Sequence, residues 1–244
     1  MNDFRGKGEL NFIKVIFNHR VCSLILFLAV VVFSPFQMVF SKDLEWTYVN
    51  EKDGIKLYKS KEKIDGLIPF KVKTVLNFPH EKVVKVLIDA EKKSLWAPKL
   101  KKTKIHKTLA YNKFVYSEYY TVPFPFYDRE FFLQGTIKTE RDSIIFSAEN
   151  PEIVHEPAED HVVVNIKKLE FKITPLGNDR THIDFTFIGD MGGMVPKFVV
   201  NIIQSKWPIK FIMALSEYIQ KNDNVECERY NTFIKGYSDK KSPG

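Results

Sequence analysis

Polar and apolar residues alternate over most of the middle of the chain, which is the pattern of β-strands that bury one face. Within residues 67–78, for example, Phe70 and Val72 alternate with Lys71 and Lys73. Residues 54–63 also have a strand pattern, although their alternation is imperfect. The alternation predicts further strands over residues 102–109, 112–122, 128–140, 143–150, 161–176 and 181–192. Because turn-forming residues stand between these segments, neighbouring strands are expected to form antiparallel hairpins.

Two segments have the spacing of helices instead. The first begins after Pro79, extends to Trp96 and is stopped by Pro98. Its apolar positions recur every three or four residues, at Val83, Val84, Leu87 and Ile88. The second covers residues 196–220 and carries two apolar stripes. Pro208 separates these stripes, and because proline lacks an amide hydrogen we expect a kink or a break there.

The element order is therefore two or three strands, a short helical region, six strands and a long C-terminal helix. This order predicts an α+β fold in which helices pack on one face of an antiparallel sheet. A sheet that curves around the long helix leaves a hydrophobic cavity if its inner face carries more aromatic surface than the helix can fill. We expect the folded domain over residues 42–221 and a loose polar tail over residues 222–244.

Residues 1–41 have the features of an export signal. Four basic residues precede residues 21–40, a stretch without charge that is long enough to span a bilayer. Small Ser41 suits a cleaved signal peptide, whereas the length of the apolar stretch suits an uncleaved membrane anchor, and both alternatives stay open. In either case the basic flank remains in the cytoplasm, and residues 42–244 are expected in the periplasm or outside the cell.

The charge balance adds one candidate interaction. The chain carries a net charge of +7, of which the first 41 residues contribute +2, so the remainder carries +5. Much of this excess lies in residues 98–107, which form either a solvated strand face or a surface for anionic lipid headgroups. Nucleic acid is not an expected partner, because no recognised binding motif accompanies the basic run. Cys227 has no second cysteine after the apolar stretch, so no internal disulfide is expected there, and we expect a monomer.

Two charged residues fall on strand faces that are otherwise apolar. In the strand over residues 128–140, Arg129 shares its face with Phe131 and Leu133. In the preceding strand, Glu118 is the lone charge on the face of Tyr116. Both charges are therefore predicted to point inward.

The neighbours Asp128 and Glu130 are predicted to point outward to solvent. Because an isolated buried charge is costly, we expect Glu118 and Arg129 to meet, directly or through water. Such a pair has two interpretations. It is a buried salt bridge that fixes the strand register, or it orients one polar group of an apolar ligand.

Four stretches of sequence carry a resemblance to a known family. They are SLWAPKLKKTKI (94–105), YSEYY (116–120), FPFYDREFF (124–132) and GGMVPKFVVNII (192–203). In this order they resemble the START domain, the steroidogenic-acute-regulatory-related lipid-transfer domain of the helix-grip superfamily, over roughly residues 44–220. The resemblance implies a curved antiparallel sheet that grips the C-terminal helix around a tunnel for one lipid.

The resemblance also implies a set of site residues. Trp96 and Pro98 match the end of the family's early helical region, and the helix that starts after Gly193 and Pro196 corresponds to a lid. Glu118 and Arg129 fall on inward charged positions of the tunnel. The residues expected to contact the ligand are Trp96, Tyr116, Glu118, Tyr120, Arg129, Phe131, Leu133, Phe185, Phe187, Val199 and Ile203.

Three functions remain open from the sequence. The first is a carrier of a lipid or sterol-like ligand, with peripheral contact to an anionic membrane. The second is a cyclase- or hydrolase-like enzyme of the same superfamily, with Glu118 as acid or base. The third is a structural or partner-binding domain with a filled core. No metal and no cofactor are expected, because the histidines lack metal-ligand spacing and glycine is sparse.

Overall fold

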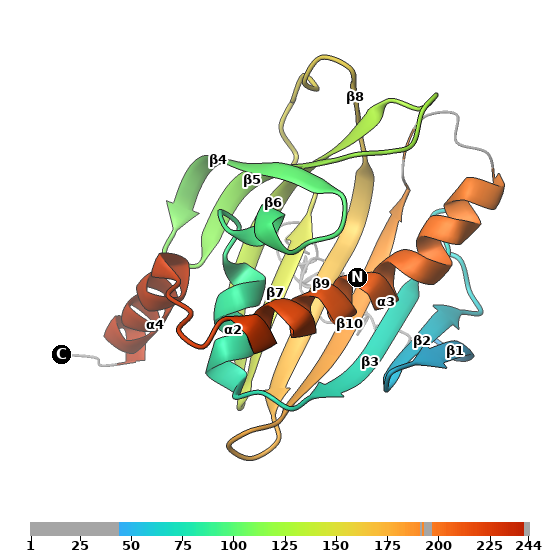
Figure 1. Cartoon of the computed structure of the whole chain (residues 1–244). Helices are drawn as coiled ribbons and strands as arrows, with labels where there is room; N and C mark the ends of the chain where they lie inside the picture. The colour runs from blue at the N-terminus through green and yellow to red at the C-terminus, as the bar shows by residue number, and fades with distance from the viewer. Residues whose placement is uncertain (1–43, 191, 193–196, 242–244) are drawn as a thin grey trace, which may run out of the picture. The chain divides into compact units, whose positions relative to one another are not determined.

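Ten strands form one sheet, and three helices and a short 3-10 helix accompany it in the described part of the chain (Figure 1). The computed structural model describes residues 44–190, 192 and 197–241, and for residues 197–205, 240 and 241 it describes the backbone alone. The predicted export signal lies outside the described residues. The elements are β1 (Trp46–Lys52), β2 (Ile55–Ser60), β3 (Phe70–Leu76), α2 (His80–Ile88), η1 (Lys93–Leu95), β4 (Leu100–Ala110), β5 (Lys113–Tyr120), β6 (Asp128–Glu140), β7 (Ser143–Glu149), β8 (His161–Val163), β9 (Asn165–Pro175), β10 (Thr181–Asp190), α3 (Lys197–Lys221) and α4 (Glu228–Lys241).

The strands follow the order β1-β2-β3-β10-β9-β7-β6-β5-β4, and all neighbours in this path are antiparallel. The short strand β8 stands off the path and pairs in parallel with β6. Helices α2 and α3 pack on one face, which we call the inner face; the opposite face is the outer face (Figure 1). The predicted α+β fold, an antiparallel sheet wrapped around a long helix, is confirmed.

The first helical region is shorter than the sequence predicts. Helix α2 begins after Pro79, buries its apolar positions and ends at Ile88. Asp89 then leaves helical geometry, and its side chain accepts a hydrogen bond from the Lys92 amide at 3.1 Å. The chain resumes as the single turn η1, after which Trp96 is buried. Because of this interruption, the side chain of Lys93 points toward the inner face and is buried.

Helix α3 runs through Pro208 without a break, so of the two predicted alternatives, a kink or a break, the break is wrong. A proline inside a helix costs about 3 kcal/mol through its missing hydrogen bond and the clash of its ring. Burial of apolar residues that follow the proline offsets that cost, and these are Ile209, Phe211, Ile212, Leu215 and Ile219.

The predicted loose tail is also wrong, because residues 228–241 form helix α4. Two side chains at this end of the chain are fully buried in the core. The free thiol of Cys227 is buried, and the ring of Phe233 is 1% exposed and stacks on Tyr111. Within the described residues, none of the helices is both long enough and apolar enough to cross a membrane.

Candidate functional site

A cavity of about 350 Å³ lies between the inner face and α3, at the end of the sheet where β5 meets β6. Its wall is mostly apolar, and its charged members among the described residues are three exposed lysines. The volume is at the lower end of the roughly 300–1,000 Å³ found for small-molecule sites. The lining residues are Phe70, Pro98, Lys99, Tyr120, Thr121, Val122, Pro123, Phe131, Phe187, Gly189, Lys206, Trp207, Pro208 and Lys210.

Three of the predicted ligand contacts, Tyr120, Phe131 and Phe187, line this cavity. Six others are buried but do not line it, namely Trp96, Tyr116, Glu118, Arg129, Leu133 and Phe185. The side chains of Val199 and Ile203 lie outside the described residues. The cavity is therefore confined to one end of the interior, whereas the prediction spreads the contacts along the whole inner face.

Sequence reasoning missed Trp207, the residue that closes the inner end of the cavity. Its indole ring lies 5.2 Å from the ring of Phe211 and 6.0 Å from that of Phe187, between ring centroids. It also contacts Tyr120 and Phe185. Beyond it the interior is filled by aromatic rings, including the stacked pair Phe171 and Phe185 at 4.2 Å (centroid to centroid). The sequence pattern marks the Trp-Pro step inside the predicted helix only as a kink or a break.

The register of β5 and β6 confirms that both unusual charges point inward. Glu118 stands opposite Phe131, and Tyr120 stands opposite Arg129. Both charged side chains are buried, Glu118 at 1% and Arg129 at 2% exposure.

The predicted direct Glu118–Arg129 pair is wrong. The partner of Glu118 is Lys93, whose Nζ lies 2.7 Å from Oε1, and both side chains are at most 4% exposed. The second oxygen, Oε2, accepts a hydrogen bond from the Tyr120 hydroxyl at 2.8 Å. Burial, reinforced by the Glu118 charge and this bond, raises the pKa of Tyr120 well above its ordinary value. Tyr120 therefore remains a neutral donor and links the cavity wall to the ion pair behind it.

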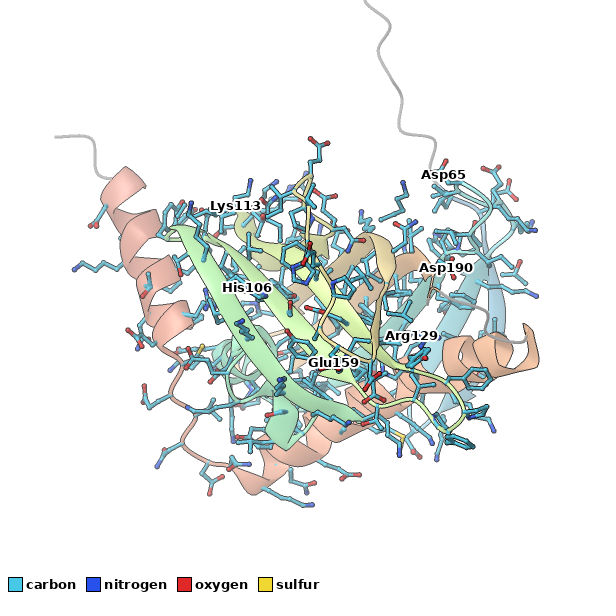
Figure 2. All side chains as sticks on the ribbon, turned by 90° about the horizontal axis from the view of Figure 1, so that it is seen from above. Asp65, His106, Lys113, Arg129, Glu159 and Asp190 are labelled. Atoms are coloured by element: carbon cyan, nitrogen blue, oxygen red, sulfur yellow. The ribbon has the colours of Figure 1, made fainter. Side chains whose placement is uncertain are left out.

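Arg129 instead holds two backbone carbonyls. Its Nη1 donates to the carbonyl of Tyr127, which ends the β5–β6 loop, and its Nη2 donates to the carbonyl of Gly192 at 3.2 Å. In Figure 2, Arg129 and Asp190 lie at the same end of the sheet, and Lys113, at the start of β5, lies at the other end. Arg129 thus connects elements that border the cavity.

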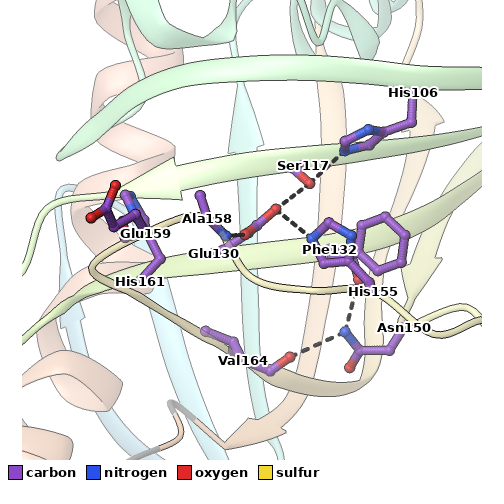
Figure 3. A network of polar contacts seen from close by, with 10 residues as sticks. All are labelled: His106, Ser117, Glu130, Phe132, Asn150, His155, Ala158, Glu159, His161 and Val164. Carbon is purple, nitrogen blue, oxygen red and sulfur yellow. Dashed lines mark hydrogen bonds and ion pairs between the residues drawn. The ribbon is translucent and has the colours of Figure 1, made fainter.

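Glu130 is on the outer face as predicted, but it is not solvated, because it is 0% exposed. The loop over residues 150–160 covers it (Figure 3). Its carboxylate accepts hydrogen bonds from Ser117 at 2.6 Å, His155 Nε2 at 2.8 Å and the Ala158 amide at 2.9 Å. Burial by itself raises the pKa of Glu130, but these hydrogen bonds outweigh burial and hold the pKa below its ordinary value.

The ionised carboxylate of Glu130 fixes the direction of its neighbours' hydrogen bonds. Because a carboxylate only accepts, the Ser117 hydroxyl donates to it, and that hydroxyl accepts in turn from His106 Nε2 at 2.7 Å. The ring of His155 stacks on Phe132 with 3.7 Å between centroids. Asp128, also predicted to be solvated, is partly covered and pairs with Lys101 at 2.6 Å. The sequence pattern of β6 contains no signal for this cover, since the loop comes from beyond β7.

Among the described residues, no group of three or more His, Cys, Asp or Glu side chains is placed to hold a metal ion. Three buried donors, Trp96 Nε1 and the hydroxyls of Thr103 and Tyr116, have no hydrogen-bond partner among the described residues. A buried donor without a partner costs about 1–3 kcal/mol. The interior is thus mostly apolar but contains hydrogen-bond donors that have no acceptor among the described residues.

Comparisons with known proteins agree with this fold. The family model described as START domain matches residues 35–222. Human STARD10 has a similar structure, with a TM-score of 0.66, 19% identity, and coverage of 81% of this chain and 82% of that chain. For human StAR-related lipid transfer protein 5 the TM-score is 0.65 at 15% identity, with 83% and 96% of the two chains covered. A fragment of the STAR-related lipid transfer protein from Xanthomonas axonopodis gives 0.62 at 20% identity, with 72% and 98% covered. No curated protein sequence matches the chain significantly.

Proposed function

Because the chain belongs to the START domain family, we propose that it binds one lipid or other hydrophobic molecule between the inner face and α3, and transfers it between membranes. The observation that carries this proposal is the apolar cavity of about 350 Å³ beside Trp207. The names of two similar structures, human StAR-related lipid transfer protein 5 and its Xanthomonas axonopodis counterpart, agree with the same activity.

A catalytic role for Glu118 has less support. Both carboxylate oxygens are engaged, one by Lys93 and one by Tyr120, and Glu118 is not among the described residues that line the cavity. A general acid or base has to reach the proton that it transfers. We therefore propose binding rather than catalysis at this site.

Native mass spectrometry tests the binding directly. Residues 42–244, purified from cells, are expected to carry an apolar small molecule at a ratio of one to one, and organic solvent is expected to release it. The proposal fails if the protein has the mass of the bare chain and binds neither a fluorescent sterol nor a fluorescent fatty acid. The same spectra report whether the protein is a monomer, as we propose.

We further propose that the mouth of the cavity docks on an anionic membrane. The β5–β6 loop, residues 121–127, presents Phe124 at 96% and Tyr127 at 63% exposure. The exposed side chains of Lys99, Lys206 and Lys210 surround the same opening. An exposed aromatic ring beside several lysines suits the interface of a membrane with anionic headgroups.

Replacing Lys206 and Lys210 together by glutamate is expected to weaken binding to vesicles that contain anionic lipid by tenfold or more, since each lysine near such a surface contributes about 1 kcal/mol. Phe124→Ser is expected to weaken vesicle binding as well. Co-sedimentation with vesicles measures both effects. Matched controls are Lys235→Glu on α4 and Val154→Ser, an equally exposed apolar residue at 98%. Equal losses in the controls would show that the mouth has no special role.

Export of the domain is part of the same proposal. The basic flank and the uncharged residues 21–40 support a position outside the cytoplasm, where a carrier exchanges lipid with the surface of a membrane. The mass of the mature protein, isolated from the cell envelope, distinguishes a cleaved signal from a retained anchor. Recovery of the full-length chain in the cytoplasm contradicts export.

A further inference from the structure

Another cavity, of about 690 Å³, is hollowed into the outer face of the sheet, and we call it the outer cavity. Its lining comes from strands β4, β5, β6 and β7 and from the loop over residues 150–160 that covers Glu130. Among the described residues, none lines both the outer cavity and the cavity beside Trp207. The proposed lipid binding therefore makes no use of the outer cavity.

The floor of the outer cavity is apolar, and one of its walls is held in place by the chain itself. Val115 and Phe132, each 5% exposed, belong to the floor. The amide of Asn150 donates to the carbonyl of Phe132 at 2.8 Å and to that of Val164 at 3.1 Å, which fastens the start of the loop (Figure 3). Because a preformed wall reduces the ordering cost of binding, this geometry favours a ligand site.

Two histidines of the lining are held in one tautomer. His155 Nε2 donates to the Glu130 carboxylate, and His106 Nε2 donates to Ser117, whose own proton goes to Glu130 (Figure 3). In the neutral ring each Nδ1 is therefore an acceptor, and neither Nδ1 has a hydrogen-bond partner among the described residues. Burial and the nearby charge of Lys104 hold the pKa of His106 below its ordinary value, so this ring is neutral at neutral pH.

The charge of the lining changes sign from one side of the outer cavity to the other. Lys107 of β4 and Lys113 of β5 form a basic side. Glu149 of β7 and Glu152 of the loop form an acidic side. Lys107 is the last residue of the basic run over residues 98–107, so the end of this run borders the outer cavity.

The strand register gives the distance between the two charged sides. Lys107 stands opposite Val115. Val115 stands opposite Gln134, which in turn stands opposite Glu149. Three strand spacings of about 4.8 Å place the Cα atoms of Lys107 and Glu149 about 14 Å apart. Because both side chains line the cavity, a molecule about 10 Å long, the length of an extended tripeptide, reaches both charged groups.

We propose that the outer cavity is a second ligand site, which binds a small zwitterion of the length of a tripeptide. The basic side receives the carboxylate of the ligand, and the acidic side receives its ammonium group. The Nδ1 atoms of His106 and His155 accept hydrogen bonds from N–H groups of the ligand. Apolar parts of the ligand cover the floor at Val115 and Phe132. This site and its ligand go beyond the proposed lipid binding.

The two charged sides together favour a zwitterion over a molecule of one charge. An elongated anion that contacts Lys107 and Lys113 would bring its far end against Glu149 and Glu152, and like charges repel. An elongated cation would meet the same repulsion at the lysines. A molecule with opposite charges at its two ends satisfies both sides.

Isothermal titration calorimetry tests the site on the full chain, purified in detergent, with trialanine as the probe. Trialanine with both ends free is expected to bind with a Kd below about 1 mM. Acetylation of its amino end and amidation of its carboxyl end are each expected to weaken binding about fivefold, as for the loss of one exposed charge pair. A protein that binds none of these peptides overturns the proposal.

Two double variants test which side of the cavity holds which end of the peptide. Lys107→Gln with Lys113→Gln is expected to weaken binding of free trialanine at least about fivefold and to leave binding of the amidated peptide unchanged. Glu149→Gln with Glu152→Gln is expected to weaken the free peptide equally and to leave the acetylated peptide unchanged. If both variants bind free trialanine as the original protein does, the charged sides do not hold the ligand and the proposal fails.

The control variant is Lys59→Gln with Lys235→Gln, which changes two exposed lysines of β2 and α4 and is expected to bind trialanine unchanged. Trialanine is also expected to leave the affinity for a fluorescent fatty acid unchanged. Displacement of the fatty acid would place the peptide in the cavity beside Trp207 and overturn the second site. Binding of trialanine by a protein that binds neither fatty acid nor sterol supports the second site and contradicts only the proposed lipid binding.

Discussion

Lys93→Met is expected to lower the free energy of unfolding by about 3–5 kcal/mol, because it leaves the Glu118 carboxylate buried without its cation. The Lys93 ammonium lies 2.7 Å from that carboxylate, and neither side chain reaches solvent. Methionine preserves most of the side-chain volume, so the loss reports on charge rather than on packing. Unfolding in urea, followed by circular dichroism, measures it.

The double variant Lys93→Met with Glu118→Gln is expected to recover most of this loss. A neutral glutamine needs no cation, and its carbonyl still accepts the hydrogen bond from Tyr120. Lys172→Met, which removes the exposed pair with Glu140, serves as the matched control and is expected to cost at most about 1 kcal/mol. A loss of similar size in Lys93→Met and the control would mean that the interior pair does not behave as a buried one.

The case of Glu118 illustrates what sequence periodicity can predict in this protein. Alternation along β5 correctly assigns Glu118 to the inner face, because side chains in a strand point to opposite faces in turn. It does not identify the partner. Lys93 comes from η1, a single turn in a segment that the sequence predicts as continuous helix, and its inward direction follows from the end of α2 at Ile88. Arg129, the predicted partner, donates hydrogen bonds to two backbone carbonyls instead.

Glu130 and Trp207 show the same limit in other ways. Periodicity places Glu130 on the outer face, but burial depends on a loop that arrives from beyond β7 and carries the hydrogen-bond donors His155 and Ala158. Trp207 belongs to a helix whose apolar stripes were recognised. Which of its side chains would limit the cavity depends on how α3 crosses the sheet, and that crossing is a tertiary property.

The overall architecture was predictable because it follows from local signals. Strand alternation, turn residues and the long C-terminal apolar helix together specify an antiparallel sheet with a helix on one face. Helix α4 was missed because its sequence is mostly polar, and of the described residues after α3 only Cys227 and Phe233 are fully buried in the core. One buried side chain among the 14 residues of α4 and one just before the helix are too few to produce an apolar stripe.

Trp207→Ala is expected to enlarge the cavity and to change which ligands fit it. The indole separates the cavity from the aromatic interior around Phe185 and Phe211, so its removal opens space between them. The free energy of unfolding should fall by about 2–4 kcal/mol, somewhat less than for a fully buried tryptophan, because Trp207 is partly exposed. Competition between fluorescent sterols and fatty acids of different bulk measures the preference, which should shift toward the bulkier ligand by about tenfold.

Trp46→Ala provides the matched control for this variant. Trp46 is similarly half-buried but lies in β1, at the edge of the sheet, where Lys71 covers its ring. Its replacement is expected to lower stability without changing the preference for ligand size. If Trp207→Ala also loses stability while the size preference stays the same, the surrounding rings have collapsed into the space, and Trp207 does not set the limit of the cavity. A shift confined to Trp207→Ala would instead identify one residue of α3 as the determinant of how much ligand the interior accepts.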